Sequence, residues 1–152
     1  MMSMGMERFG GDSGYRRGMK GLNVRAEQRL QDELIIWLTT VSTAGQPQTS
    51  PVWFWWDGEE FLIYSKAGTA RTGNIAANPR VALNLDGDGQ GGSVVTVEGE
   101  ARLDHDAPTS PEVPEFIEKY GHKIASYGWT PEKFANDYPM AVRVKPVRAR
   151  SW

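Results

Sequence analysis

The sequence predicts a mainly β protein whose strands run antiparallel and close into a small barrel. Three observations support this prediction: the apolar runs are short, turn residues separate them, and helical spacing is confined to brief stretches. Closing such a sheet removes its exposed edges. Gly99 predicts a β-bulge in the fifth strand. The six predicted strands cover residues 35–41, 48–56, 60–66, 80–86, 93–103 and 140–151, the last of them interrupted at Pro146.

Tight turns separate the strands in the first half of the chain. A short helix over residues 24–34 comes first, because strong helix formers place Leu30 and Leu34 one turn apart. Ala44-Gly45 then supplies a turn after the first strand, and Asp57-Gly58 is the strongest short hairpin signal in the sequence. We therefore expect the first three strands to form a meander.

Four consecutive aromatic residues, from Trp53 to Trp56, end the second predicted strand. Alternation along a strand sends Trp53 and Trp55 to one face and Phe54 and Trp56 to the other. Packing of a barrel strand on both sides explains this pattern. A pair of rings that lines a ring-binding pocket or a dimer surface explains it as well.

Helical segments interrupt the strand pattern at three further places. Gly68 ends the third strand, and Thr69 is placed to cap a short helix that stops before Pro79. Residues 111–127 have apolar side chains at helical spacing, which predicts an amphipathic helix. A second short helix over residues 130–137 follows it, with proline in its first turn.

The length of 152 residues predicts one domain, here residues 24–152. An arm over residues 1–23 precedes it and is expected to be flexible, because it is rich in Gly, Met and Arg and has no periodicity. The cations Arg16, Arg17, Lys20 and Arg25 offer a second interpretation, in which the arm reaches an anionic cofactor tail.

Composition excludes several classes of protein. The absence of cysteine excludes disulfides and thiolate chemistry, and two histidines, His105 and His122, are too few for a convincing metal site. A net charge of −2 gives no case for nucleic-acid binding. No run of about 18 apolar residues predicts a membrane span, and no apolar signal-peptide region is present. We expect a cytoplasmic protein without a nucleic-acid or membrane partner.

The loop over residues 87–92 formally matches the dinucleotide fingerprint G-x-G-x-x-G. It precedes a strand rather than a helix, and Asp86 and Asp88 lie where a pyrophosphate would bind, so a hairpin loop is the better interpretation. A calcium loop is also disfavoured, since position twelve is Val97 rather than a bidentate glutamate.

Residues 65–74 form the strongest candidate site. Ser65 and Lys66 end a strand, and the helix from Thr69 presents free N–H groups and a positive dipole end, with Arg71 in its first turn. Hydroxyls, backbone amides and two cations this close together predict a phosphate cradle. A capped surface helix with solvated charges fits the same spacing, and the sequence alone leaves both interpretations open.

A family resemblance adds to this interpretation. It rests on WLTTVSTAGQPQTSPVWFWWDGEEFLIYSKAGTARTGNIAANPRVALNLDGDGQGG, with EVPEFIEKY and the terminal RVKPVRARSW. These segments, from about residue 30 to 152, resemble the split β-barrel flavoproteins related to pyridoxamine 5′-phosphate oxidase. They are most similar to the branch that uses the deazaflavin coenzyme F420. The resemblance implies a six-stranded antiparallel FMN-binding split barrel.

The resemblance also implies a homodimer with two cofactor sites at the subunit interface. The cofactor ring would lie along the second strand and meet mainly backbone, the phosphate would meet the 65–74 segment, and the last strand would contribute from the partner subunit. The implied site residues are Thr49, Ser50, Pro51, Val52 and Trp53 for the ring, Ser65, Lys66, Arg71, Thr72 and Asn74 for the phosphate, and Arg150 and Trp152 of the partner subunit.

We expect an oxidoreductase that transfers a hydride between coenzyme F420 and an unidentified small organic substrate. Two alternatives stay open: an FMN-dependent oxidase or reductase, and a non-catalytic module that binds flavin, deazaflavin or haem. His105 and His122 are the haem-ligand candidates. Tyr64, Tyr120 and Tyr127 are candidate proton donors, although core packing accounts better for each of them.

Overall fold

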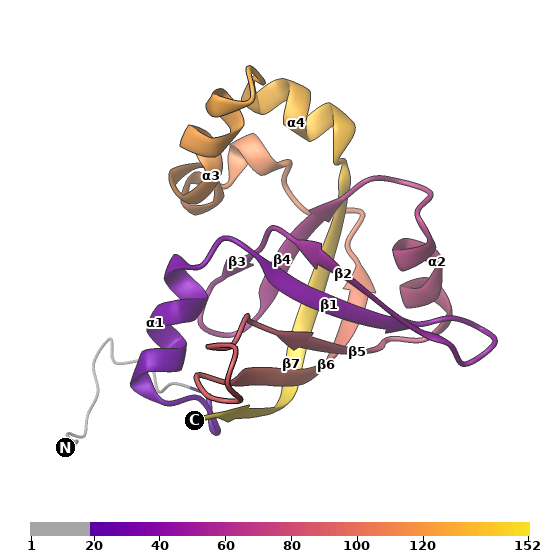
Figure 1. The fold of residues 1–152 in the computed structure, drawn as a ribbon. Helices are drawn as coiled ribbons and strands as arrows, with labels where there is room; N and C mark the ends of the chain where they lie inside the picture. The colour runs from indigo at the N-terminus through magenta and orange to yellow at the C-terminus, as the bar shows by residue number, and fades with distance from the viewer. Residues whose placement is uncertain (1–18) are drawn as a thin grey trace, which may run out of the picture.

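One curled antiparallel sheet of seven strands carries the fold of residues 19–152, the part of the chain that the computed structural model describes (Figure 1). The strands are β1 (Ile36–Val41), β2 (Pro47–Val52), β3 (Trp55–Trp56), β4 (Phe61–Ser65), β5 (Arg80–Asn84), β6 (Val95–Leu103) and β7 (Met140–Ser151). Their order across the sheet is β2-β1-β5-β6-β7-β4-β3. All neighbouring strands are antiparallel, which confirms the predicted mainly β split barrel.

The four helices predicted from the sequence are present. They are α1 (Val24–Asp32), α2 (Ala70–Ala77), α3 (Pro114–Ser126) and α4 (Pro131–Asp137), with a short 3-10 turn η1 (Ser110–Glu112) before α3. Figure 1 shows α3 and α4 together over one end of the sheet, whereas α1 and α2 lie on opposite sides of it. The positive φ of 72° at Gly68 supplies the turn that the sequence predicts between β4 and α2.

The strand predicted over residues 48–56 is divided into β2 and β3, and this gives seven strands rather than six. Trp53 and Phe54 leave the sheet between them. The amide of Phe54 donates to the hydroxyl of Tyr120 at 2.9 Å, and its carbonyl accepts from Nζ of Lys119 at 2.9 Å. Side chains of α3 thus satisfy backbone groups that a neighbouring strand would otherwise bond, which the strand pattern alone does not reveal.

The sequence predicts an interruption of the last strand at Pro146. This prediction is wrong, because β7 runs through Pro146 without a break. The bulge predicted at Gly99 is present as a register shift: Gly99 pairs with Pro146, and Val147 becomes the extra residue of β7. A Cβ on Gly99 would lie 2.8 Å from the carbonyl oxygen of Lys145, so the two backbones approach too closely for a side chain.

Two hydrophobic clusters fill the space around the sheet. The barrel core lies inside the curled sheet and contains Phe54 and Trp56. The helix-side core lies between the sheet, α3 and α4, and Trp53 and Trp55 pack against it. The alternation predicted for the four aromatic residues is therefore confirmed. The buried members of the helix-side core are Leu62, Tyr64, Val113, Phe116, Tyr120, Ile124, Phe134 and Ala141.

The start of the described chain is attached to its end. Ser151 Oγ donates to the carbonyl of Gly21 at 2.8 Å and accepts from the amide of Asn23 at 2.9 Å. Residues 1–18 of the predicted arm, which include Arg16 and Arg17, lie outside the described residues. Within residues 19–152, no helix has the length and apolarity needed to cross a membrane.

Two adjacent side chains of α3 stabilise the break between β2 and β3. The hydroxyl of Tyr120 accepts from the amide of Phe54 and donates to the carbonyl of Leu34 at 2.8 Å. Nζ of Lys119 lies 3.7 Å from the centroid of the Phe54 ring, in addition to its bond with the Phe54 carbonyl. Burial lowers the pKa of Lys119 to about 8.

Replacing Tyr120 by phenylalanine is expected to lower the free energy of unfolding by about 1–3 kcal/mol, because the buried amide of Phe54 loses its acceptor. Urea unfolding measures this loss. Tyr127→Phe is the matched control, since that residue is 52% exposed and the same atom is removed from a wet site. Equal effects of the two substitutions would contradict the anchoring role of Tyr120.

Lys119→Met is expected to reduce the pH dependence of stability between about pH 8 and 10.5. In this window the unfolded chain binds a proton at Lys119 that the folded protein does not, so stability rises with pH in the wild type. The variant should lose this part of the rise. Urea unfolding at a series of pH values tests it, with Lys123→Met on the same helix as the control. Parallel pH curves for Lys119→Met and the wild type would count against it.

Candidate functional site

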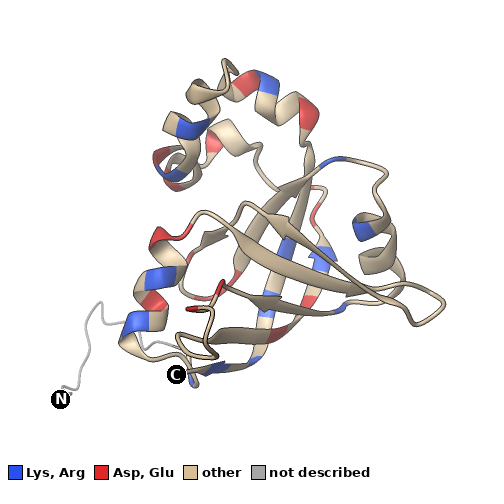
Figure 2. Cartoon of the chain, in the orientation of Figure 1, with Lys and Arg blue, Asp and Glu red and all other residues tan. Residues whose placement is uncertain are grey.

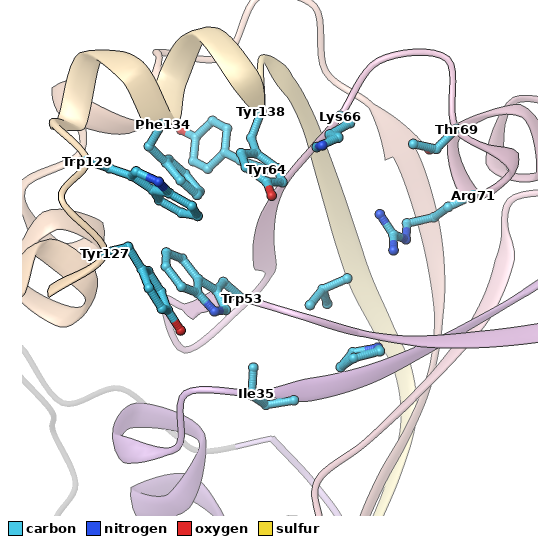
Figure 3. Close-up of a pocket in the computed structure, with 12 residues that line it drawn as sticks. Ile35, Trp53, Tyr64, Lys66, Thr69, Arg71, Tyr127, Trp129, Phe134 and Tyr138 are labelled. Carbon is cyan, nitrogen blue, oxygen red and sulfur yellow. The ribbon is translucent and has the colours of Figure 1, made fainter. Parts of the chain in front are cut away.

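A pocket of about 500 Å³ opens between the β2 side of the sheet and the helices α3 and α4. Figure 3 shows that its two ends differ in chemistry: Lys66, Thr69 and Arg71 lie at one end, and aromatic side chains gather at the other. Pro51 and Val52 of β2 form part of the wall between them. The pocket therefore combines a cationic end with a flat apolar surface.

The cationic end is built around the guanidinium of Arg71. Its Nη1 donates to Ser65 Oγ and its Nη2 donates to Ser50 Oγ, both at 2.8 Å. Ser65 ends β4 and Ser50 lies within β2, so the two hydroxyls fix the guanidinium between two strands. Nε of Arg71 is buried and has no hydrogen-bond partner. A guanidinium has five N–H donors, and the bonds to Ser65 and Ser50 use two of them.

No acid compensates the charge of Arg71 within residues 19–152, since none of the ion pairs there involves it. Strands β1 and β2 and helix α2 contain no Asp or Glu, as the absence of red on them in Figure 2 shows. Burial lowers the pKa of Arg71, which reflects the cost of removing this cation from water. A half-buried cation without an acid favours an anionic ligand.

The first turn of α2 adds backbone donors at the same end. Thr69 is the N-cap, and its Oγ1 accepts from the amide of Thr72 at 3.3 Å. Since the first amides of a helix have no helical acceptor, those of Ala70 and Arg71 stay available. Lys66 is exposed at the end of β4, with Nζ 5.6 Å from the centroid of the Tyr138 ring. Together these donors fit the oxygen atoms of a phosphate.

Asn74 anchors α2 to the sheet. Its Nδ2 donates to Gln48 Oε1 at 2.7 Å and to Thr40 Oγ1 at 3.0 Å, so it ties the helix to β2 and β1. The hydroxyl of Thr72 is likewise committed, because it donates to the carbonyl of Thr69 at 2.9 Å. Both residues are buried and neither lines the pocket.

Stacked rings form the other end of the pocket. Trp53 stacks on Tyr120 with centroids 4.6 Å apart and an interplanar angle of 6°, and its centroid lies 5.2 Å from that of Phe134. Tyr127, Trp129 and Tyr138 complete this wall (Figure 3). Trp53 reaches the pocket because the chain leaves the sheet at that residue.

The predicted site residues fall into three groups. Five line the pocket: Pro51, Val52, Trp53, Lys66 and Arg71. Five support it or flank it without lining it: Ser50 and Ser65 bind Arg71, Thr72 and Asn74 shape α2, and Thr49 lies on β2 with its hydroxyl bonded to Thr39 at 2.9 Å.

The third group lies elsewhere in the subunit. Trp152 is bonded through Nε1 to the carbonyl of Gly91 at 3.3 Å, and Arg150 pairs with Thr96 on β6. Neither lines the pocket. In Figure 1 the C-terminal end of β7 lies far from α2.

The cofactor-binding residues predicted from the sequence do not include the wall formed by α4 and the segments beside it. Trp129, Phe134 and Tyr138 line the pocket, as does Ile35 before β1. Tyr64 and Tyr127 also line it, and the sequence had singled these two out as candidate proton donors. Four aromatic residues within the twelve positions 127–138 are the signal of this wall in the sequence. Helical spacing is equally typical of core residues, so the pattern alone does not distinguish the two.

The comparisons with known proteins agree with this arrangement. The family model described as pyridoxamine 5′-phosphate oxidase matches residues 23–152. Among curated proteins, none matches the chain significantly.

Several solved structures share the fold. An F420 reductase is 25% identical, with a TM-score of 0.63 over 81% of this chain and 94% of that one. The heme storage protein HutZ of Vibrio cholerae is 16% identical, with a TM-score of 0.61 over 86% and 94%. General Stress Protein 26 of Bacillus anthracis is 19% identical, with a TM-score of 0.61 over 81% and 87%.

Arg71→Met is expected to leave the free energy of unfolding of the ligand-free protein unchanged or higher, because the substitution removes an uncompensated, desolvated cation. Arg143→Met is the matched control. Arg143 is also half-buried, but its Nε bonds Asp104 Oδ2 at 2.7 Å, so its loss should cost about 1–3 kcal/mol. Urea unfolding of both variants checks this, and an equal loss in the two would mean that Arg71 is a structural tether.

Proposed function

Because the chain belongs to the pyridoxamine 5′-phosphate oxidase family, we propose that its pocket holds coenzyme F420 and that the protein is an oxidoreductase acting on a small organic substrate. The bound deazaflavin supplies hydride transfer, and the protein supplies binding, orientation and exclusion of water. The guanidinium of Arg71 carries the proposal: it lines the pocket, its bonds to Ser65 and Ser50 use two of its five N–H donors, and it pairs with no acid among residues 19–152.

The cationic end would hold the phosphate. Arg71 is oriented before a ligand arrives, since Ser50 and Ser65 fix two of its nitrogens. Lys66 would add a second, mobile charge, and the first-turn amides of α2 would bind further oxygens. Asn74 would act indirectly by keeping α2 against β2.

The wall along β2 would hold the ring. The end of β2 lies beside the pocket, and its residues Pro51 and Val52 offer the ring an apolar surface. Trp53 would limit how far the ring reaches toward the aromatic end, because stacking with Tyr120 and Phe134 fixes its plane. Apolar walls of this kind exclude water from the reacting face.

The site would be completed by a second copy of the chain in a homodimer. β2 is an outer strand of the sheet in residues 19–152, so a partner has access to the wall that it forms. Arg150 and Trp152 do not line the pocket of their own subunit. Arg150 and Trp152 of the partner subunit would reach it instead.

Three tyrosines were candidate proton donors, and two have committed hydroxyls. The Tyr64 hydroxyl donates to the carbonyl of Pro108 at 2.8 Å, and burial raises the pKa of Tyr64 to about 12. Tyr120 is bonded to the strand break, and burial raises its pKa as well. Tyr127 is exposed at the aromatic end, so among the three it is the tyrosine best placed to meet a substrate.

The choice of deazaflavin over flavin is supported by the similarity to an F420 reductase at 25% identity. FMN is the alternative, and yellow protein on purification would favour it. The similarity to a heme storage protein raises haem as a third ligand. His105 and His122 are both exposed and neither lines the pocket, which speaks against haem ligation there.

Arg71→Ala and Lys66→Ala are each expected to weaken binding of F420 by about 1–3 kcal/mol, the loss of a charged hydrogen bond, or roughly 5- to 150-fold in Kd. Titration of the purified protein with F420, followed by cofactor fluorescence, measures the change. Arg80→Ala is the control, because this exposed arginine follows α2 in the chain and does not line the pocket.

The outcomes separate the candidate functions. Binding of F420 that depends on Arg71 and Lys66 supports the proposal, whereas preferred binding of FMN keeps the site and changes the cofactor. Wild-type affinity in both pocket variants, or no binding of either ligand, would overturn it.

A further inference from the structure

The β1–β2 hairpin determines which backbone groups of β2 face outward. The amide of Ser42 donates to the carbonyl of Gln46 at 2.9 Å, which makes these residues a hydrogen-bonded pair. Hydrogen-bonded and non-bonded pairs alternate along an antiparallel ladder. With Thr40 opposite Gln48 and Leu38 opposite Ser50, the even-numbered residues of β2 bond to β1. Residues 47, 49 and 51 therefore turn their backbone groups away from β1.

Two of these three outward positions are prolines, and proline has no amide hydrogen. The outward edge of β2 therefore has three carbonyls, at Pro47, Thr49 and Pro51, but one N–H, at Thr49. Nε2 of Gln46 donates to the carbonyl of Pro47 at 3.1 Å, which agrees with a carbonyl outside the ladder. At outward positions proline costs the sheet no hydrogen bond. The two prolines therefore remove N–H donors from the outward edge of β2 without removing a hydrogen bond from the sheet.

The second proline lies at the pocket. Pro51 lines it together with Val52 and Trp53. The hydroxyl of the preceding residue, Ser50, accepts from Nη2 of Arg71, so this part of β2 runs beside the cationic end. Pro47 lies at the other end of the strand and does not line the pocket. A missing donor at residue 51 therefore affects a ligand in the pocket, whereas one at residue 47 does not.

The missing donor matters for one pair of ligands in particular. A flavin ring has a nitrogen with a lone pair at position 5, and this atom accepts a hydrogen bond from a protein donor. A deazaflavin has a C–H group at the same position and cannot accept one. A site without a donor there leaves the flavin acceptor unsatisfied and costs the deazaflavin nothing.

We infer that Pro51 is a specificity residue, which withholds an amide hydrogen from position 5 of the cofactor ring and thereby favours a deazaflavin over a flavin. This inference rests on the proposed function, because it requires a ring of this kind along β2. It concerns the choice between two rings of the same shape, and not the affinity for the phosphate, which Arg71 and Lys66 provide.

The test compares FMN with 5-deaza-FMN, which carries the same tail and phosphate and differs at position 5. Kd values for both are measured by fluorescence titration on the wild type, Pro51→Ala and Pro47→Ala. Pro51→Ala restores one N–H beside the pocket, and Pro47→Ala makes the same change on the same edge away from it. Thermal unfolding confirms that each variant is folded, and Pro51→Ser supplies the same N–H if the alanine variant is not.

The preference for 5-deaza-FMN over FMN is expected to fall by roughly 3- to 10-fold in Pro51→Ala, the equivalent of one neutral hydrogen bond. It should be unchanged in Pro47→Ala. An unchanged preference in Pro51→Ala, or an equal change in both variants, overturns the inference while the proposed function stands. If the wild type binds neither of these ligands nor F420, the proposed function and this inference fail together.

Discussion

The hydroxyl of Tyr120 takes the place of a strand neighbour at Phe54, and the pocket depends on this exchange. If the chain continued as one strand from residue 47 to 56, Trp53 would remain within the sheet. The break lets Trp53 leave it and stack on Tyr120 and Phe134. Nζ of Lys119 donates a hydrogen bond to the carbonyl of Phe54. Helix α3, which covers one end of the sheet, therefore also shapes the edge of the sheet.

The cationic end of the pocket holds Arg71 in an unfavourable electrostatic environment. Elsewhere in the described chain, Arg102 pairs with the carboxylate of Glu60 and Arg143 with that of Asp104. Arg71 is instead held by two neutral hydroxyls, which orient the guanidinium but do not neutralise it. Such an arrangement costs stability in the free protein and is typical of a site that is completed by its ligand. Packing requirements alone do not explain it.

Local patterns in the sequence were sufficient for most of the fold. Turn residues such as Asp57-Gly58 and caps such as Thr69 act over a few positions, so the strands and α2 could be predicted. Most of the cationic end could also be predicted, because Ser65 to Arg71 are contiguous in the chain. The break after Val52 was not predicted, since its cause is a hydroxyl 66 residues away in the chain. The aromatic wall is likewise formed by segments that tertiary packing alone brings together.

The two prolines of β2 also affect whether the open edge of the sheet can pair with strands of other proteins. An unpaired strand with free amides and carbonyls recruits strands from other chains and so initiates aggregation. Pro47 and Pro51 leave β2 unable to donate at two of its three outward positions, so an incoming strand would find a broken ladder. The edge can then stay open to a small ligand or a specific partner surface without acting as a template for fibril growth.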